Sequence, residues 1–189
     1  MPNEDLPLNR LYNFGINQLE KNEIGIEIEL EGDYLQGFQR SVNWKSVDDH
    51  SLRGESIEHV LKAPVPFAHV GTVLNRLITF LNMKGCKIRL SDRCGVHIHI
   101  NVQHMTLKQI MNFICLYLVL EPLMVAYCGQ SREGNFFCLR AKDASRIIDL
   151  LIAVAEREDI TPILGNTDEF RYASINLAAI KKFGSLEFR

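Results

Sequence analysis

The stretch Ile24-Gly-Ile-Glu-Ile-Glu-Leu-Glu31 alternates apolar and acidic residues with a period of two. Successive side chains of a β-strand point to opposite faces, so the pattern predicts a strand with one apolar and one charged face. The apolar face carries Ile26, Ile28 and Leu30, and the charged face carries Glu27, Glu29 and Glu31. Such a strand is typical of an antiparallel sheet with one face on the core and the other open.

Two further stretches predict strands of the same sheet. Cys94-Gly-Val-His-Ile-His-Ile-Asn-Val102 alternates clearly, with His97, His99 and Asn101 on one face. Its other face, with Val96, Ile98 and Ile100, is expected to point to the core. A weaker strand over residues 56–62 ends before Pro64 and carries Glu58.

The remaining elements are mostly helical. Apolar spacing predicts helices over residues 8–21, 66–84, 106–127 and 143–157, and short strands over 171–178 and 185–189 around a turn at Phe183-Gly184. Gly85 is expected to end the second helix and Asp143 to cap the fourth. Because strands bracket helices without regular alternation, we predict a single α+β domain over residues 1–189, with helices packed on one face of an antiparallel sheet.

Composition narrows the classes of partner. The 189 residues include 21 basic and 23 acidic side chains, a net charge of −2, and 47% of them are apolar. This length and apolar content suit one folded domain. The balanced charge does not favour nucleic acid or an anionic membrane as partner, so we expect a small molecule or another protein.

The compartment is expected to be the cytoplasm. The five cysteines are odd in number and include no Cys-x-x-Cys motif, which favours reduced thiols. The first ten residues lack the apolar segment of a signal peptide. Residues 110–127 are strongly apolar, but Asn112, Glu121 and Pro122 interrupt them. A membrane span needs about 20 clean apolar residues, so we expect a buried core helix here.

The acidic and histidine strands could each carry chemistry. Three glutamates on one face are either a solvated sheet surface or a site for a hard cation such as Mg²⁺, which takes oxygen ligands. His97 and His99 could ligate a transition metal, hydrogen-bond a phosphate or carboxylate, or transfer a proton. The sequence contains no P-loop, Gly-x-Gly-x-x-Gly or Gly-x-Ser-x-Gly motif.

The order of the polar residues along the chain resembles a known family. The ordered features are Gly25-Ile-Glu-Ile-Glu29, Asp48 and Asp49 with Ser51-Leu52, Glu58 ahead of Ala63-Pro64, Cys94-Gly-Val-His-Ile-His99, Arg132, Arg171-Tyr172 with Asn176, and Leu186-Glu-Phe-Arg189. From Gly25 to the last residue, this series resembles the amidoligase family, relatives of glutamate–cysteine ligase and glutamine synthetase.

The resemblance implies an ATP- and Mg²⁺-dependent carboxylate–amine ligase. It also implies a curved antiparallel sheet like the catalytic fold of those two enzymes, and carboxylate and amine substrates that are small molecules or peptides. In the family the carboxylate is phosphorylated by ATP, and the amine then attacks the acyl phosphate. Carried over by position, the metal ligands are Glu27, Glu29, Glu58 and Glu187, the catalytic residues are His97, Arg132, Arg171 and Arg189, and the nucleotide-binding residues are His99, Asn101, Tyr172 and Asn176.

Further expectations concern the two ends of the chain, the ligand on the second strand and the competing functions. Residues 1–22 are expected to be an N-terminal extension, and the family's further C-terminal helices are expected to be absent after Arg189. The second-strand ligand is either Glu55 or Glu58. Two other functions compete with the ligase: a transition-metal enzyme built on His97, His99 and a glutamate, and a protein that keeps the fold for binding or a structural role without catalysis.

Overall fold

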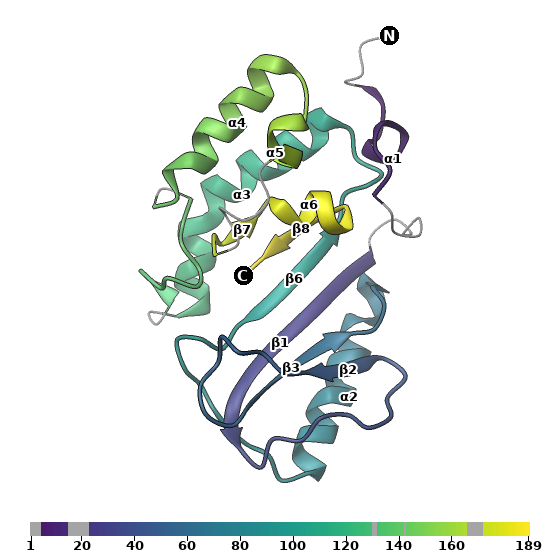
Figure 1. Ribbon diagram of the computed structural model, residues 1–189, viewed down its shortest axis with the longest axis vertical. Coiled ribbons are helices and arrows are strands. Elements are labelled where there is room, and N and C mark those ends of the chain that lie inside the picture. The colour runs from purple at the N-terminus through teal and green to yellow at the C-terminus, as the bar shows by residue number, and fades with distance from the viewer. Residues whose placement is uncertain (1–4, 15–22, 130–131, 142, 166–171) are drawn as a thin grey trace. The chain divides into compact units, whose positions relative to one another are not determined.

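The computed structural model describes residues 5–14, 23–129, 132–141, 143–165 and 172–189 (Figure 1). The chain divides into two compact units. We call Glu20–Ile100 the sheet unit, and Met1–Leu19 with Asn101–Arg189 the helical unit. The prediction of a single domain stays a prediction, and the two units are described separately.

The sheet unit is built around one long strand. β1 (Glu23–Asp33) pairs antiparallel with β3 (Ser56–Leu61) on one side and with β6 (Val96–Asn101) on the other. β2 (Trp44–Val47) adds to the far side of β3, while β4 (Val65–Pro66) and β5 (Lys87–Arg89) pair with the two ends of β1. The three predicted strands are thus confirmed, with ends that differ by one or two residues.

One helix covers one face of this sheet. After a short 3-10 turn, η2 (Phe67–His69), α2 (Val70–Met83) buries Val73, Leu77 and Leu81. They pack with the apolar side chains of the strands, which are Ile26, Leu30, Trp44, Ile57 and Leu61. The helix ends before Gly85, whose φ of 67° is the left-handed conformation that glycine adopts easily. This arrangement confirms an α+β fold with an open antiparallel sheet.

The prediction for the apolar residues of β6 was wrong in part. Val96 and Ile98 were expected to point to the core, but they are 50% and 38% exposed. The buried side chains of α2 pack on β1, β2 and β3. An alternating pattern indicates which residues share a face, but not how far a helix extends across that face.

The helical unit surrounds a second core. Its elements are α1 (Leu8–Leu11), α3 (Leu107–Cys128), α4 (Ser145–Arg157), α5 (Thr161–Gly165), β7 (Ile175–Asn176), α6 (Ala178–Phe183) and β8 (Ser185–Phe188). Thr106 and Gln109 form a capping box at the start of α3, where each side chain accepts the other residue's backbone N–H. β7 and β8 pair antiparallel, with Asn176 opposite Glu187.

Three local predictions need correction. Asp143 does not cap α4: the N-cap is Ala144, and the Asp143 carboxylate lies 3.5 Å from the Nε of Arg140. Residues 178–183 form α6 in place of a simple turn, because Ala-Ala-Ile-Lys-Lys-Phe contains mostly good helix formers. Of the helix predicted over residues 8–21, α1 has four residues, and residues 15–21 lie outside the described part.

The prediction of a buried core helix holds for one side of α3. Leu107, Ile110, Ile114, Glu121 and Val125 are buried, whereas other large apolar side chains of the helix are exposed. By length and composition, this 22-residue helix could also cross a membrane. The core helices of soluble proteins meet the same criterion, so this finding alone does not distinguish the two.

Candidate functional site

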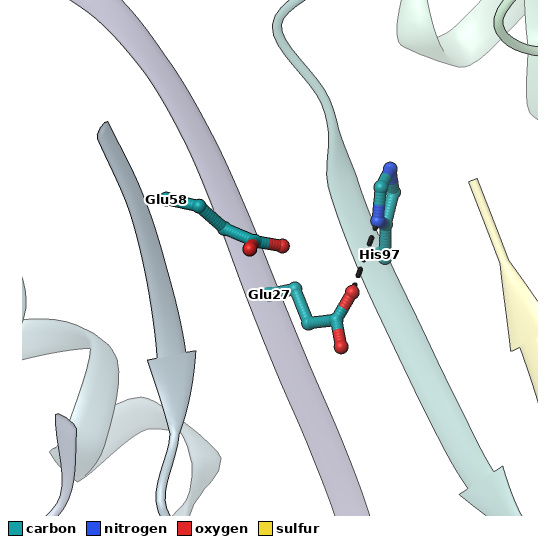
Figure 2. A group of neighbouring side chains, drawn as sticks. All are labelled: Glu27, Glu58 and His97. Carbon is teal, nitrogen blue, oxygen red and sulfur yellow. Dashed lines mark hydrogen bonds and ion pairs between the residues drawn. The ribbon is translucent and has the colours of Figure 1, made fainter. Parts of the chain in front are cut away.

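Three polar side chains from three neighbouring strands converge on the open face of the sheet unit. They are Glu27 of β1, Glu58 of β3 and His97 of β6, and Figure 2 shows them pointing toward one another. The ligand atoms of the three side chains all lie within 4.8 Å of one another. The register explains the convergence, because Glu27 stands opposite His97 and Glu29 stands opposite Glu58.

The ring of His97 lies between two carboxylates. Its Nδ1 is 3.2 Å from Oε2 of Glu27, and its Nε2 is 3.6 Å from Oε2 of Glu29. The His97 side chain is 6% exposed and that of Glu29 is 10% exposed, so both contacts are largely shielded from water. A short, shielded contact between an imidazole and a carboxylate fixes the ring orientation.

The carboxyl of Glu27 is held in its charged form. Burial alone would raise its pKa, but the contacts with His97 and His99 outweigh that effect and lower the pKa below its usual range. The His99 contact joins its Nε2 to Oε1 of Glu27 over 3.5 Å. Both oxygens of Glu27 therefore face histidine nitrogens, in a place that favours negative charge.

Gly95 provides the space in which Glu29 and His97 meet. A Cβ atom at this position would stand 2.9 Å from Oε2 of Glu29 and 3.1 Å from Nε2 of His97. The backbone carbonyl of Gly95 also accepts the N–H of Glu29 at 2.9 Å. Gly95 is not among the predicted site residues, and its place directly before a His-x-His strand was the signal for it.

Asp49 is a second residue missing from the predicted site. Burial opposes its ionisation, but hydrogen bonds from Ser51, the contact with Glu29 and the charge of His97 together lower the pKa of its carboxyl. The backbone N–H of Ser51 donates to Oδ1 of Asp49 at 2.8 Å. Asp49 thus adds a carboxylate to the edge of the cluster.

The structure distinguishes the two candidate ligands of the second strand. Glu58 belongs to the cluster with Glu27 and His97. Glu55 precedes the strand, is exposed, and accepts the backbone N–H of Leu35. Glu31, the third acidic residue of β1, accepts the N–H of Arg53 at 2.8 Å and so supports the neighbouring turn.

Other predicted site residues form a polar group within the helical unit. Glu187 is 5% exposed, and its two oxygens have different partners. Oε2 accepts Nδ2 of Asn176 at 2.8 Å, and Oε1 lies 2.6 Å from Nη2 of Arg189. Burial raises the pKa of the Cys138 thiol, and the positive charges of Arg132 and Arg189 offset part of that rise.

The remaining predicted site residues are Asn101, Tyr172 and Arg171. Oδ1 of Asn101 accepts the N–H of Gln103 at 3.0 Å, which is a local turn contact. Tyr172 is 38% exposed, and its ring meets Phe137 edge-on at 5.8 Å. Arg171 lies outside the described residues.

Comparison with models of known protein families gives a match over much of the chain. The sequence model of a family described as "putative amidoligase enzyme" matches residues 61–189, about two thirds of the chain. The matched segment contains His97, His99, Glu187 and Arg189, whereas Glu27 and Glu58 precede it. The comparisons with curated proteins and with solved structures give no match.

Proposed function

This chain belongs to the amidoligase family, and we propose that it is an ATP- and Mg²⁺-dependent carboxylate–amine ligase. The proposed product is an amide of the isopeptide type, formed through an acyl phosphate. The observation that carries the proposal is the cluster of Glu27, Glu58 and His97, three potential ligands from three strands within 4.8 Å of one another.

The donor set of the cluster suits a divalent cation. Glu27 and Glu58 supply oxygen atoms, which Mg²⁺ prefers, and His97 supplies a nitrogen. The lowered pKa of Glu27 keeps one ligand ionised. Glu29, the other predicted ligand of β1, lies 3.6 Å from Nε2 of His97, a contact that supports an oriented ring in this proposal. When bound, a magnesium ion would neutralise charge on the phosphates of ATP.

The proposed reaction has two steps. An oxygen of the substrate carboxylate attacks the γ-phosphorus of ATP and ADP leaves; the amine then attacks the acyl carbon and inorganic phosphate leaves. Phosphoryl transfer depends mainly on positioning and charge neutralisation, so the protein needs carboxylates for metal and basic groups for phosphate.

The basic residues of this proposal all belong to the helical unit. Arg189 is oriented by its 2.6 Å contact with Glu187, which Asn176 supports from the other oxygen. An arginine held in this way can bind phosphate oxygens with its remaining N–H groups. We assign Arg132, Arg171 and Arg189 to the transferring phosphoryl group, and His99, Asn101, Tyr172 and Asn176 to the nucleotide.

The proposal extends to the features that the family implies. We infer a sheet curved as in glutamine synthetase and glutamate–cysteine ligase, a cytoplasmic location, and carboxylate and amine substrates that are small molecules or peptides. Nucleic acid and membrane are not proposed as partners, since the net charge of the chain is −2.

Calorimetric titration with Mg²⁺–ATP tests the nucleotide site. We expect binding by the wild type, at least about tenfold weaker binding by Glu58→Gln, and unchanged binding by Glu55→Gln. The second variant is the matched control, because it removes the same charge from an exposed position outside the cluster. No binding by the wild type at millimolar nucleotide, or equal binding by all three proteins, would contradict the proposal.

A transition-metal enzyme is the second candidate, and the nitrogen of His97 in the cluster favours it. Elemental analysis of the purified protein separates the two functions, together with ADP release measured over a panel of carboxylates and amines. Stoichiometric zinc or iron without ADP release supports the second candidate. ADP release that requires both a carboxylate and an amine supports the ligase.

A further inference from the structure

One side of α3 in the helical unit carries large apolar side chains that are exposed. Six large side chains on it are between 40% and 89% exposed, namely Leu116, Val119, Leu120, Leu123, Met124 and Tyr127. We call these six residues the α3 stripe. A helix that is apolar on all sides is usually covered on all sides, and a contiguous exposed apolar patch usually marks an interaction surface.

The spacing of the stripe is that of a helix that packs against another helix. Leu116, Leu120, Leu123 and Tyr127 follow one another at intervals of four, three and four residues. These intervals are the heptad spacing of a helix-to-helix seam. Val119 and Met124 occupy the positions that flank this seam. In helix pairs, charged residues at these positions usually determine which partner helix can bind.

Charge also limits what can cover the stripe. Between Lys108 and Arg132 the sequence has one charged residue, Glu121. It is 4% exposed on the opposite side of the helix, where it accepts the N–H of Ala141 and the hydroxyl of Ser174. An acidic or basic partner would therefore find no complementary charge on the stripe.

A lipid surface fits the stripe less well than a protein does. Helices that lie on membranes combine their apolar face with lysines and arginines, and residues 109–131 contain none. A lone spanning helix would expose all of its sides to lipid, whereas Ile110 and Ile114 of α3 are fully buried in the core of the helical unit.

We propose that the α3 stripe is a homodimer interface, in which the helix packs against the same helix of a second copy. Across a two-fold axis each surface meets itself, so a stripe without charges meets no like charge. The area is also sufficient. A large side chain presents about 200 Å² when fully open, so the stripe offers roughly 700 Å². One partner in a standard interface buries about 800 Å².

The mass in solution tests this proposal directly. Light scattering on a sizing column should give twice the chain mass of 21.6 kDa for the wild type. Leu123→Glu places a charge in the centre of the stripe and should raise the dissociation constant by at least about thirtyfold. Ile78→Glu on α2 is the matched control, because Ile78 is 54% exposed and lies outside the stripe; it should leave the mass unchanged.

A second measurement does not depend on the folding of any variant. If the wild type unfolds from a dimer, its unfolding temperature should rise with protein concentration. A wild type that is monomeric at all concentrations overturns the proposal. This holds both for a monomer that does not bind phosphatidylcholine vesicles and for one that binds them through α3. A folded Leu123→Glu that retains the dimer mass shows that another surface mediates the association, and overturns it as well.

Discussion

His97 shows how several acidic side chains can share one face of a sheet. Its two ring nitrogens face Glu27 and Glu29, at 3.2 Å and 3.6 Å. Like charges at this spacing repel when nothing lies between them, and the imidazole lies between them here. The same contacts orient the three side chains before any cation arrives, which reduces the entropy that binding costs.

Gly95→Ala should weaken metal binding more than it weakens the fold. The added Cβ would stand 2.9 Å from Oε2 of Glu29, so the carboxylate and the ring of His97 must shift. We expect Mn²⁺ affinity, measured by electron paramagnetic resonance, to fall about 10- to 100-fold, as for other changes beside metal ligands. Gly71→Ala is the control, since nothing lies within 4 Å of a Cβ there. Equal affinity in both variants would contradict the assignment of Gly95.

His59 predicts a pH dependence of stability in the sheet unit. It is fully buried beside Phe38 and Phe80. The hydroxyl oxygen of Ser46 accepts the N–H of Phe38 at 2.8 Å and also shares a hydrogen bond of 3.0 Å with Nδ1 of His59. Burial lowers the pKa of His59 from 6.5 to about 4.

Because its pKa is lowered, His59 destabilises the fold as the pH falls from 6.5 toward 4, and it has no such effect above pH 6.5. In this window the unfolded chain binds a proton that the folded chain does not. One pKa unit corresponds to about 1.4 kcal/mol, so the loss at pH 4 is on the order of 3 kcal/mol. Urea unfolding at several pH values measures it. His59→Phe should have a smaller slope between pH 6.5 and 4, and an unchanged slope would contradict this origin.

At the scale of elements, α3 carries its one acidic residue inward. The Glu121 carboxylate accepts the N–H of Ala141 through both oxygens, at 3.0 Å and 3.2 Å, and also accepts the hydroxyl of Ser174. The carbonyl of Ser174 accepts the N–H of Arg189 at 3.0 Å. The Glu121 side chain therefore connects α3 to the segments before α4 and before β7, and Ser174 continues the connection to Arg189, a predicted phosphate-binding residue.

Glu121→Leu should destabilise the protein by about 2–4 kcal/mol. The substitution leaves two buried donors without an acceptor, and each costs about 1–3 kcal/mol. Glu121→Gln retains one acceptor oxygen and should cost less. Glu156→Gln, at an exposed position of α4, should stay within about 0.5 kcal/mol of the wild type. Urea unfolding gives the free energy of unfolding of the four proteins. A Glu121→Leu variant as stable as the wild type would show that the buried carboxylate is dispensable.

At the scale of the whole molecule, metal binding and folding are linked in this proposal. A cation that binds only the folded state at a hundred times its dissociation constant stabilises it by about 2.7 kcal/mol. Trp44 is the single tryptophan, and it is buried under α2 with Nε1 donating to the carbonyl of Val73. Its fluorescence should therefore report an unfolding temperature that rises by roughly 5–10 °C with saturating Mg²⁺.

Glu27→Gln is the variant that tests this linkage. It removes the charge of the central ligand and retains the shape of the side chain, so the rise in unfolding temperature with Mg²⁺ should disappear. Glu55→Gln should keep the full increase, because Glu55 lies outside the cluster. An increase in Glu27→Gln equal to that of the wild type would place the cation elsewhere.

The sequence alone determined which residues share a face and which family the chain resembles. The shared faces rest on a local rule, since a period of two places Glu27 with Glu29 and His97 with His99. The resemblance rests on the order of the polar motifs along the chain, and the matching family model confirms it. The helix over residues 178–183 was not predicted, because the apolar pattern of these residues is too short to distinguish a helix from a strand followed by a turn.

The tertiary structure decided the register between strands, and register depends on contacts distant in sequence. It placed Glu58 beside Glu27 and His97 and left Glu55 on the loop. It also brought Asp49 to Glu29, and it turned Glu121 inward while leaving the α3 stripe open. No local pattern contains this information, because a one-residue slip in pairing would move every side chain of a strand to the other face.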